Sequence, residues 1–146
     1  AVDLRYIASA LKISSELERI ADQAVNIIDR SLVLINSLPF KPLIDIPRMA
    51  SMAQNMLKDS IESFIKKDAD LARNVCWRDD DMDEMNDQIF RVLLTYMMQE
   101  PTSIKRAVGL MLIGRHLERI ADHSTNISEE VIYYVKGKSI KHHYTD

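Results

Sequence analysis

The sequence predicts an all-α protein built from four long antiparallel helices. Its 146 residues include only 3 Gly and 4 Pro, so long uninterrupted elements are expected. Between the prolines, apolar side chains recur at helical spacing. In addition, the pattern LERIADQAVN at residues 17–26 recurs as LERIADHSTN at residues 117–126, one hundred positions later. Two copies of one polar pattern on two helical stretches indicate an internal repeat.

The first predicted helix fills the region before the first proline. We expect it to cover residues 2–38, a length of about 50 Å at 1.5 Å per residue. Pro39, Pro42 and Pro47 then interrupt the chain, because proline cannot donate a backbone hydrogen bond within a helix. Residues 39–45 are therefore expected to form a linker.

The second and third predicted helices follow with a short break between them. The second begins near Ile46, and its basic end at Lys66 suits a helix C-terminus. Asp68 is expected to be the N-cap of the third helix, because its carboxylate can accept a hydrogen bond from a free backbone amide. The third helix is expected to end near Gln99, just before Pro101.

The fourth predicted helix carries the second copy of the repeated pattern. It is expected to begin at Thr102 or Ser103, with either residue as N-cap. Gly137 is expected to end it, because glycine readily adopts the left-handed conformation that follows many helices. Residues 46–137 would then form a three-helix unit, and residues 138–146 a tail.

The repeated pattern places polar side chains four residues apart, so that they line one face of each helix. These side chains are Glu18, Asp22 and Asn26 in the first copy and Glu118, Asp122 and Asn126 in the second. Two carboxylates at this spacing repel each other by a few tenths of a kcal/mol in an isolated helix. Two interpretations remain open: a solvated, salt-bridged face, or a row of oxygen ligands for a hard or borderline cation.

A second acidic cluster lies on the third helix. Asp79 occupies a position in the apolar stripe where leucine would be ordinary, and Asp83 follows it at the same four-residue spacing as Glu118 and Asp122. Two acidic pairs facing each other across a helix interface would repel strongly unless a cation or protons intervened. The neighbouring acids of the same run are interpreted as a solvated face.

Several function classes are disfavoured by composition. The net charge of −3 argues against nucleic acid as the main partner. No apolar run reaches about 18 residues, so no membrane span is expected. The single cysteine, Cys76, cannot form an internal disulfide and suits a reducing compartment. The chain also lacks an initiator methionine and begins inside a helical pattern, so it is expected to be a piece of a longer protein.

Motifs of catalytic sites are missing as well. There is no Glu-x-x-His pair, no glycine-rich phosphate loop, no paired-cysteine motif and no nucleophile elbow. Long helices also leave little room for catalytic loops. We therefore expect a protein that is not an enzyme.

The quoted motifs resemble the PhoU family of phosphate-transport accessory and signalling proteins. The similarity includes DLR at residues 3–5, LKI at residues 11–13, both LERIAD copies, and the stretch that ends in ISEEVIYYVKG. The family is a tandem repeat of two three-helix bundles. The resemblance therefore implies that residues 1–38 are the last helix of a first repeat and that residues 46–137 are a complete second repeat.

The resemblance also implies a metal site, because Glu/Asp-x-x-x-Asp motifs hold multinuclear iron clusters in some family members. In the second repeat the implied ligands are Asp79, Asp83, Glu118 and Asp122, with Asn126 as a neighbouring ligand or orienting group. In the first repeat only Glu18, Asp22 and Asn26 are present, so that site is incomplete within this chain. Iron clusters are the implied cofactor, with Zn, Mn, Mg and Ca ions as further options.

In function, the resemblance implies regulation. PhoU-like proteins couple a phosphate-specific ABC transporter to a sensor histidine kinase and damp the phosphate-starvation response. A cytoplasmic homodimer that reaches the membrane through these partners is expected. The alternatives are a helical scaffold or adaptor with solvated acidic faces, and a PhoU-like accessory of another phosphate carrier. A metal-dependent enzyme is disfavoured because histidine ligands are missing.

Overall fold

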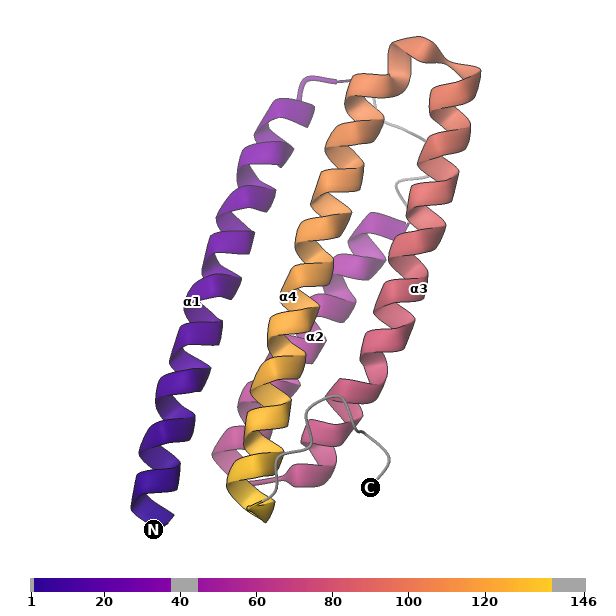
Figure 1. Cartoon of the computed structure of the whole chain (residues 1–146). Coiled ribbons are helices and arrows are strands. Elements are labelled where there is room, and N and C mark those ends of the chain that lie inside the picture. The colour runs from indigo at the N-terminus through magenta and orange to yellow at the C-terminus, as the bar shows by residue number, and fades with distance from the viewer. Residues whose placement is uncertain (1, 38–44, 138–146) are drawn as a thin grey trace.

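The computed structural model describes residues 2–37 and 45–137, and it describes side chains from residue 4 onward (Figure 1). These ranges contain four long helices, one short 3-10 turn and no strand, which confirms the predicted all-α fold. The helices are α1 (Val2–Leu34), α2 (Asp45–Lys66), α3 (Ala69–Gln99) and α4 (Ile104–Lys136). None of the described helices combines the length and the apolarity that a membrane crossing requires.

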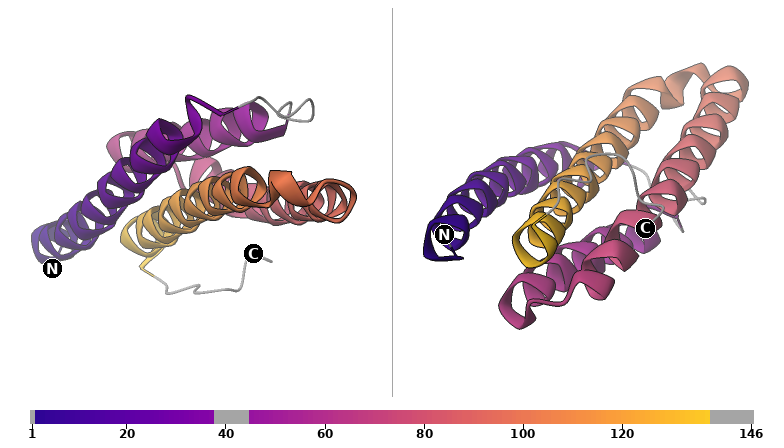
Figure 2. Two further views of the ribbon diagram at one scale, coloured as in Figure 1. Left: turned by 90° about the horizontal axis from the view of Figure 1, so that it is seen from above. Right: turned by 60° about the horizontal axis from the view of Figure 1, so that its bottom comes forward.

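Helix α4 is the centre of the arrangement (Figures 1 and 2). Helices α2 and α3 form an antiparallel hairpin on one side of α4, and α1 lies antiparallel to α4 on the other side. Within the described residues, the backbone of α1 comes close to α4 but not to α2 or α3. At one end of α1, Tyr6 also stacks on Phe64 of α2, with ring centroids 5.8 Å apart.

The core lies between α4 and the α2–α3 hairpin. Three methionines, Met49, Met56 and Met82, are fully buried there, as expected for flexible side chains that fill gaps in a core. Helix α1 contributes much less: among its described side chains, the buried hydrophobic ones are Ile13 and Ile20. The bundle of α2, α3 and α4 therefore holds most of the buried apolar area, and α1 depends on a narrow strip against α4.

The ends of α1 and α2 differ from the predicted ones. Helix α1 ends at Leu34 rather than at residue 38, because the Ser37 amide bonds back to the Leu34 carbonyl at 2.9 Å and closes a tighter turn. Helix α2 begins at Asp45, one residue before the predicted start. The rest of the predicted linker and the predicted tail, residues 39–44 and 138–146, lie outside the described residues.

The start of α4 also differs from the prediction. Residues 101–103 form a 3-10 turn, and the helix begins at Ile104. Ser103 precedes it but does not cap it with its side chain. Its buried hydroxyl donates instead to the carbonyl of Glu100 at 2.6 Å, within the turn that leaves α3. The far end is as predicted: Gly137 has φ +69 and its amide bonds to the Tyr133 carbonyl.

The predicted N-cap of α3 is confirmed and supports the first testable prediction. The Leu71 amide donates to Asp68 Oδ1 at 3.0 Å, and Asp68 has the extended backbone of an N-cap. Replacing Asp68 with alanine is expected to lower the free energy of unfolding by about 1 kcal/mol. Urea denaturation would measure the loss. Asp68→Asn, which keeps an acceptor oxygen, should retain most of the stability, and equal losses in both variants would contradict the capping role.

Candidate metal centre

Three carboxylates from two helices converge on the surface of the bundle. Asp79 and Asp83 stand one turn apart on α3, and Asp122 faces them from α4. One oxygen from each lies within 4.8 Å of the others. Among the described residues, no other group of three or more His, Cys, Asp or Glu side chains converges in this way. We refer to Asp79, Asp83 and Asp122 as the carboxylate cluster.

Asp79 is the most perturbed member of the carboxylate cluster. Burial, and after it the negative charges of Asp83 and Asp122, together raise its pKa from 3.8 to about 7. Its Oδ1 atom is buried and has no hydrogen-bond partner among the described residues. A carboxyl group that is uncharged through most of the acidic range, with an orphaned oxygen, is costly to bury without a ligand.

The other acids at the site share this tendency. Burial raises the pKa of Asp83, Glu118 and Asp122, and the charge of Asp83 contributes at both Glu118 and Asp122. For Asp122 the shift is opposed by His123, by a hydrogen bond to the Asp79 carboxyl and by Arg119. These raised pKa values mean that the carboxyl groups hold protons more readily than ordinary acids, and a cation would relieve the same repulsion.

Glu118 lies beside the carboxylate cluster and is fixed by an amide. Asn86 Nδ2 of α3 donates to Glu118 Oε2 of α4. Helix α4 has a glycine at 114, one turn before Glu118, and a Cβ atom there would come within 2.9 Å of Asn86 Oδ1. Gly114 therefore makes room for the amide that holds Glu118. The small residue thus lets α3 come close to the polar row of α4.

Asn126, one turn after Asp122, makes a contact with α1. Its side chain donates to Glu16 Oε2 of α1 at 3.3 Å, on the side of α4 that faces α1. The reason is helical geometry: with 3.6 residues per turn, eight residues overshoot two turns by roughly 80°. Glu118 and Asn126 are therefore turned toward different neighbours, although both belong to the repeated pattern.

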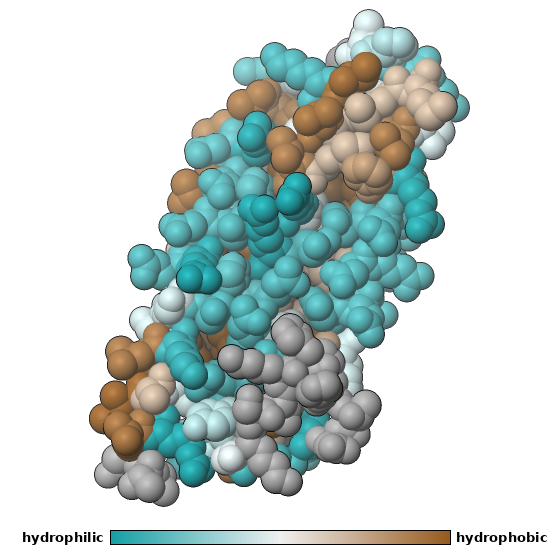
Figure 3. Space-filling model, in the orientation of Figure 1, coloured by the Kyte–Doolittle hydropathy of each residue, from teal (hydrophilic) through white to brown (hydrophobic). Residues whose placement is uncertain are grey.

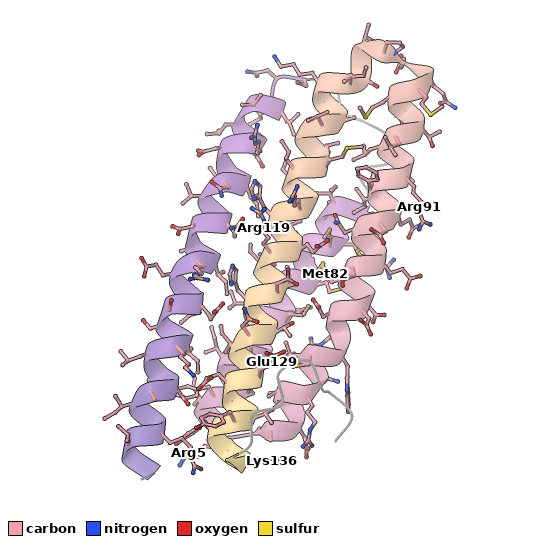
Figure 4. The ribbon with its side chains drawn as sticks, in the orientation of Figure 1. Arg5, Met82, Arg91, Arg119, Glu129 and Lys136 are labelled. Carbon is pink, nitrogen blue, oxygen red and sulfur yellow. The ribbon has the colours of Figure 1, made fainter. Side chains whose placement is uncertain are left out.

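The three polar residues of the first copy, Glu18, Asp22 and Asn26, are exposed on α1. Asp22 lines a hollow of about 380 Å³ between α1 and α4. The hollow is lined by three pairs of residues, each pair one hundred positions apart: Arg19 and Arg119, Asp22 and Asp122, Gln23 and His123. Figure 4 shows Arg119 in the space between the two helices. The structure thus brings the two copies of the pattern together, but it does not place Glu18, Asp22 or Asn26 in a cluster of three ligands.

Two histidine contacts were not predicted from the sequence. His116 Nδ1 lies 2.7 Å from Gln23 Oε1, and His123 Nδ1 lies 2.6 Å from Glu16 Oε2. Both pairs join α4 to α1, and they are reciprocal: residues 16 and 116, and 23 and 123, are equivalent in the repeat. This reciprocity is what an antiparallel pair of repeated helices produces. The offset of one hundred residues between the two copies was the signal in the sequence that could have predicted these paired contacts.

The chemistry of the site is that of an all-oxygen ligand set. Carboxylate oxygens suit Mg, Ca, Mn and ferric iron, and the orphaned oxygen of Asp79 and the mutual repulsion of the cluster are what a cation would relieve. Cys76, the single cysteine of the chain, lies one turn before Asp79 on α3. Its thiol is buried, and burial raises the pKa of this thiol to about 12. It therefore remains protonated and unreactive near neutral pH.

Fold and site together define an all-helical bundle protein that carries a carboxylate cluster between two of its helices. Residues 1–31 and 46–131 match the family model described as PhoU domain. The chain belongs to the PhoU family.

Named relatives and solved structures agree with this family. The PhoU homologs of Aquifex aeolicus and Caulobacter vibrioides, both phosphate-specific transport system accessory proteins, are 43% and 42% identical, over 96% of this chain. The chain spans 63% and 61% of their lengths. The crystal structure of PhoU from Pseudomonas aeruginosa covers 94% of this chain with 37% identity and a TM-score of 0.90, and the chain covers 66% of it. The crystal structure of PhoU from Streptococcus pneumoniae covers 95% of this chain with 26% identity and a TM-score of 0.87, and the chain covers 66% of it.

Proposed function

We propose that the chain acts in the regulation of phosphate uptake and of the phosphate-starvation response. The observation that carries this proposal is its membership of the PhoU family, together with relatives named as accessory proteins of the phosphate-specific transport system. The role is regulatory rather than catalytic. It is exercised in the cytoplasm by docking to a phosphate ABC transporter and to a sensor histidine kinase, and these partners bring it to the membrane.

In this proposal the carboxylate cluster holds metal. Asp79, Asp83 and Asp122 supply oxygens from two helices, and Glu118, oriented by Asn86, stands next to them. A bound cation would neutralise charges that otherwise repel, and it would fix α3 against α4. Multinuclear iron is the proposed occupant, and Mn, Mg, Ca or Zn would be alternatives. Zn is the least suited of these, because structural Zn sites are built from Cys and His ligands.

The exposed face of α1 supports the proposed division into repeats, with residues 1–38 as the last helix of a first repeat and 46–137 as the second. Leu32 of α1 is 60% exposed, whereas its repeat equivalent on α4, Ile132, is fully buried against the hairpin. Ile28 and Ser128 differ in the same way. The face that α4 covers with α2 and α3 thus lies open on α1. A helical hairpin of a first repeat, or a second copy of the chain in a homodimer, would cover it.

Partner binding tests the proposed function. The purified chain is expected to bind the nucleotide-binding subunit of a phosphate ABC transporter, or the cytoplasmic part of the sensor kinase, in a surface-captured binding assay. Repeating the assay with an ABC transporter subunit of unrelated substrate gives the control. Binding to neither phosphate partner would contradict the proposal and favour the alternative of an adaptor with solvated acidic faces. Binding to a different phosphate carrier would favour the alternative of an accessory of that carrier.

A further inference from the structure

A second hollow, of about 350 Å³, lies far from the carboxylate cluster, where the end of α1 meets the start of α4. Its lining comes from both helices: Arg30, Val33, Leu34 and Ser37 of α1, and Lys105, Arg106, Val108, Gly109 and Leu112 of α4. We call it the basic groove. Figure 3 shows hydrophobic surface at the upper end of this face of the molecule, where the two helix ends lie side by side.

The basic groove combines positive charge with apolar walls. Arg30, Lys105 and Arg106 line it, and no lining residue is a carboxylate. The first turn of α4 adds the partial positive charge of a helix N-terminus. At its floor the helices come close, since a Cβ atom at Gly109 would lie 3.0 Å from Leu34 Cδ2. The groove is thus narrow, cationic and partly apolar.

The internal repeat provides a comparison within the same molecule. Because α1 and α4 are antiparallel copies, the other end of the pair is built from the equivalent residues. There Glu130 stands at the position of Arg30, and it accepts a hydrogen bond from Ser9 Oγ at 2.9 Å. Lys12 Nζ lies 3.7 Å from the same carboxylate and 6.0 Å from the centre of the Tyr133 ring.

The two ends therefore differ in charge and in side-chain size. At the far end, the chain itself supplies a carboxylate beside a lysine and two tyrosines, Tyr133 and Tyr134. In the basic groove the equivalent positions hold Arg30, Val33 and Leu34, so the carboxylate is replaced by a cation and the tyrosines by smaller side chains. The basic groove therefore lacks a carboxylate with a large side chain next to it.

We propose that the basic groove docks an acidic peptide segment of a protein partner, which places a Glu or Asp side chain between Arg30 and Lys105 and an adjacent aromatic or aliphatic side chain against Val33 and Val108. The size of the groove suits two or three side chains rather than a flat lipid surface. This inference is independent of the metal and of the proposed regulatory function, because it rests only on the α1–α4 junction.

The probe is a fluorescently labelled peptide with the sequence of residues 124–137, which combines two glutamates with two adjacent tyrosines. Fluorescence anisotropy is expected to show saturable binding to the whole chain. The double variant Arg30→Glu plus Lys105→Glu should bind the peptide at least ten-fold more weakly. The matched control, Lys58→Glu plus Arg91→Glu, changes two exposed cations elsewhere and should bind like the parent. Circular dichroism verifies that all variants are folded.

A second peptide tests the carboxylate itself. With Gln at both glutamate positions, 129 and 130, it should bind the parent at least ten-fold more weakly. Equal affinity of both peptides, or equal binding by the parent and the groove variant, would overturn the proposal. Two other outcomes would also overturn it. In the first, the parent binds no peptide but binds phosphatidylglycerol vesicles, and the groove variant does not bind these vesicles. In the second, the parent and the control variant self-associate in sedimentation, and the groove variant does not.

Discussion

Replacing Asp79 with asparagine is expected to make the metal-free protein more stable at pH 8 and to reduce the pH dependence of its stability. The pKa of Asp79 is raised from 3.8 to about 7 in the folded chain. Between these values the native state binds a proton that the unfolded state has lost. The stabilisation by Asp79 is therefore complete below about pH 3.8, and it is lost as the pH rises through 7.

The size of this effect follows from the shift. A change of about three pKa units corresponds to roughly 4 kcal/mol, and because the site is partly exposed, solvent screening reduces the expected value to about 2 kcal/mol. Urea denaturation from pH 4 to pH 8 in a chelator would measure it. Asp81→Asn, an exposed change on the same helix, is the control and should keep the slope of the parent. Identical slopes for Asp79→Asn and the parent would refute the account.

Truncating both buried isoleucines of α1 is expected to detach that helix while the bundle stays folded. Ile13 and Ile20 are each 6% exposed, and removing such side chains costs about 2–5 kcal/mol apiece. An isolated helix is marginally stable in water, so α1 is expected to unfold once this apolar contact with α4 is lost. In hydrogen exchange, the double variant Ile13→Ala plus Ile20→Ala should lose protection throughout α1 and retain it in α2, α3 and α4.

The exposed side of α1 supplies a matched control. Val25 and Leu32 are 55% and 60% exposed, so the double variant Val25→Ala plus Leu32→Ala should keep the protection of the parent. Loss of protection in all four helices of the Ile variant would show that α1 and the bundle unfold as one unit. That result would contradict the division at residue 38.

Local signals in the sequence were enough for much of the fold. Proline positions, the N-cap at Asp68 and the terminal glycine at 137 mark helix boundaries through backbone chemistry that does not depend on distant residues. Ser103 was not predictable in this way. Its hydroxyl bonds to a carbonyl at the end of α3 rather than to α4, and that choice depends on how tightly the two helices are connected.

The candidate site was predictable where spacing alone decides the geometry. The shared four-residue spacing of Asp79 and Asp83 and of Glu118 and Asp122 indicated facing acids, and the structure brings Asp122 to the α3 pair. The spacing did not reveal the contact of Asn126 with Glu16, because a row of eight residues rotates around the helix toward α1. Predicting the contacts of His116 and His123 would have required the register between α1 and α4, which the local sequence of either helix does not specify.

The measurement that tests the central claim most directly is metal content after loading. Chelator-stripped protein is incubated with ferric iron or Mn, desalted, and subjected to elemental analysis and thermal denaturation. We compare the parent, Asp83→Asn plus Asp122→Asn, and the control Asp81→Asn plus Glu84→Gln, which changes two exposed acids outside the cluster. The account predicts stoichiometric metal and a higher Tm for the parent and the control, and neither for the cluster variant. Equal metal content in all three proteins, or none in any, would contradict a metal centre at Asp79, Asp83 and Asp122.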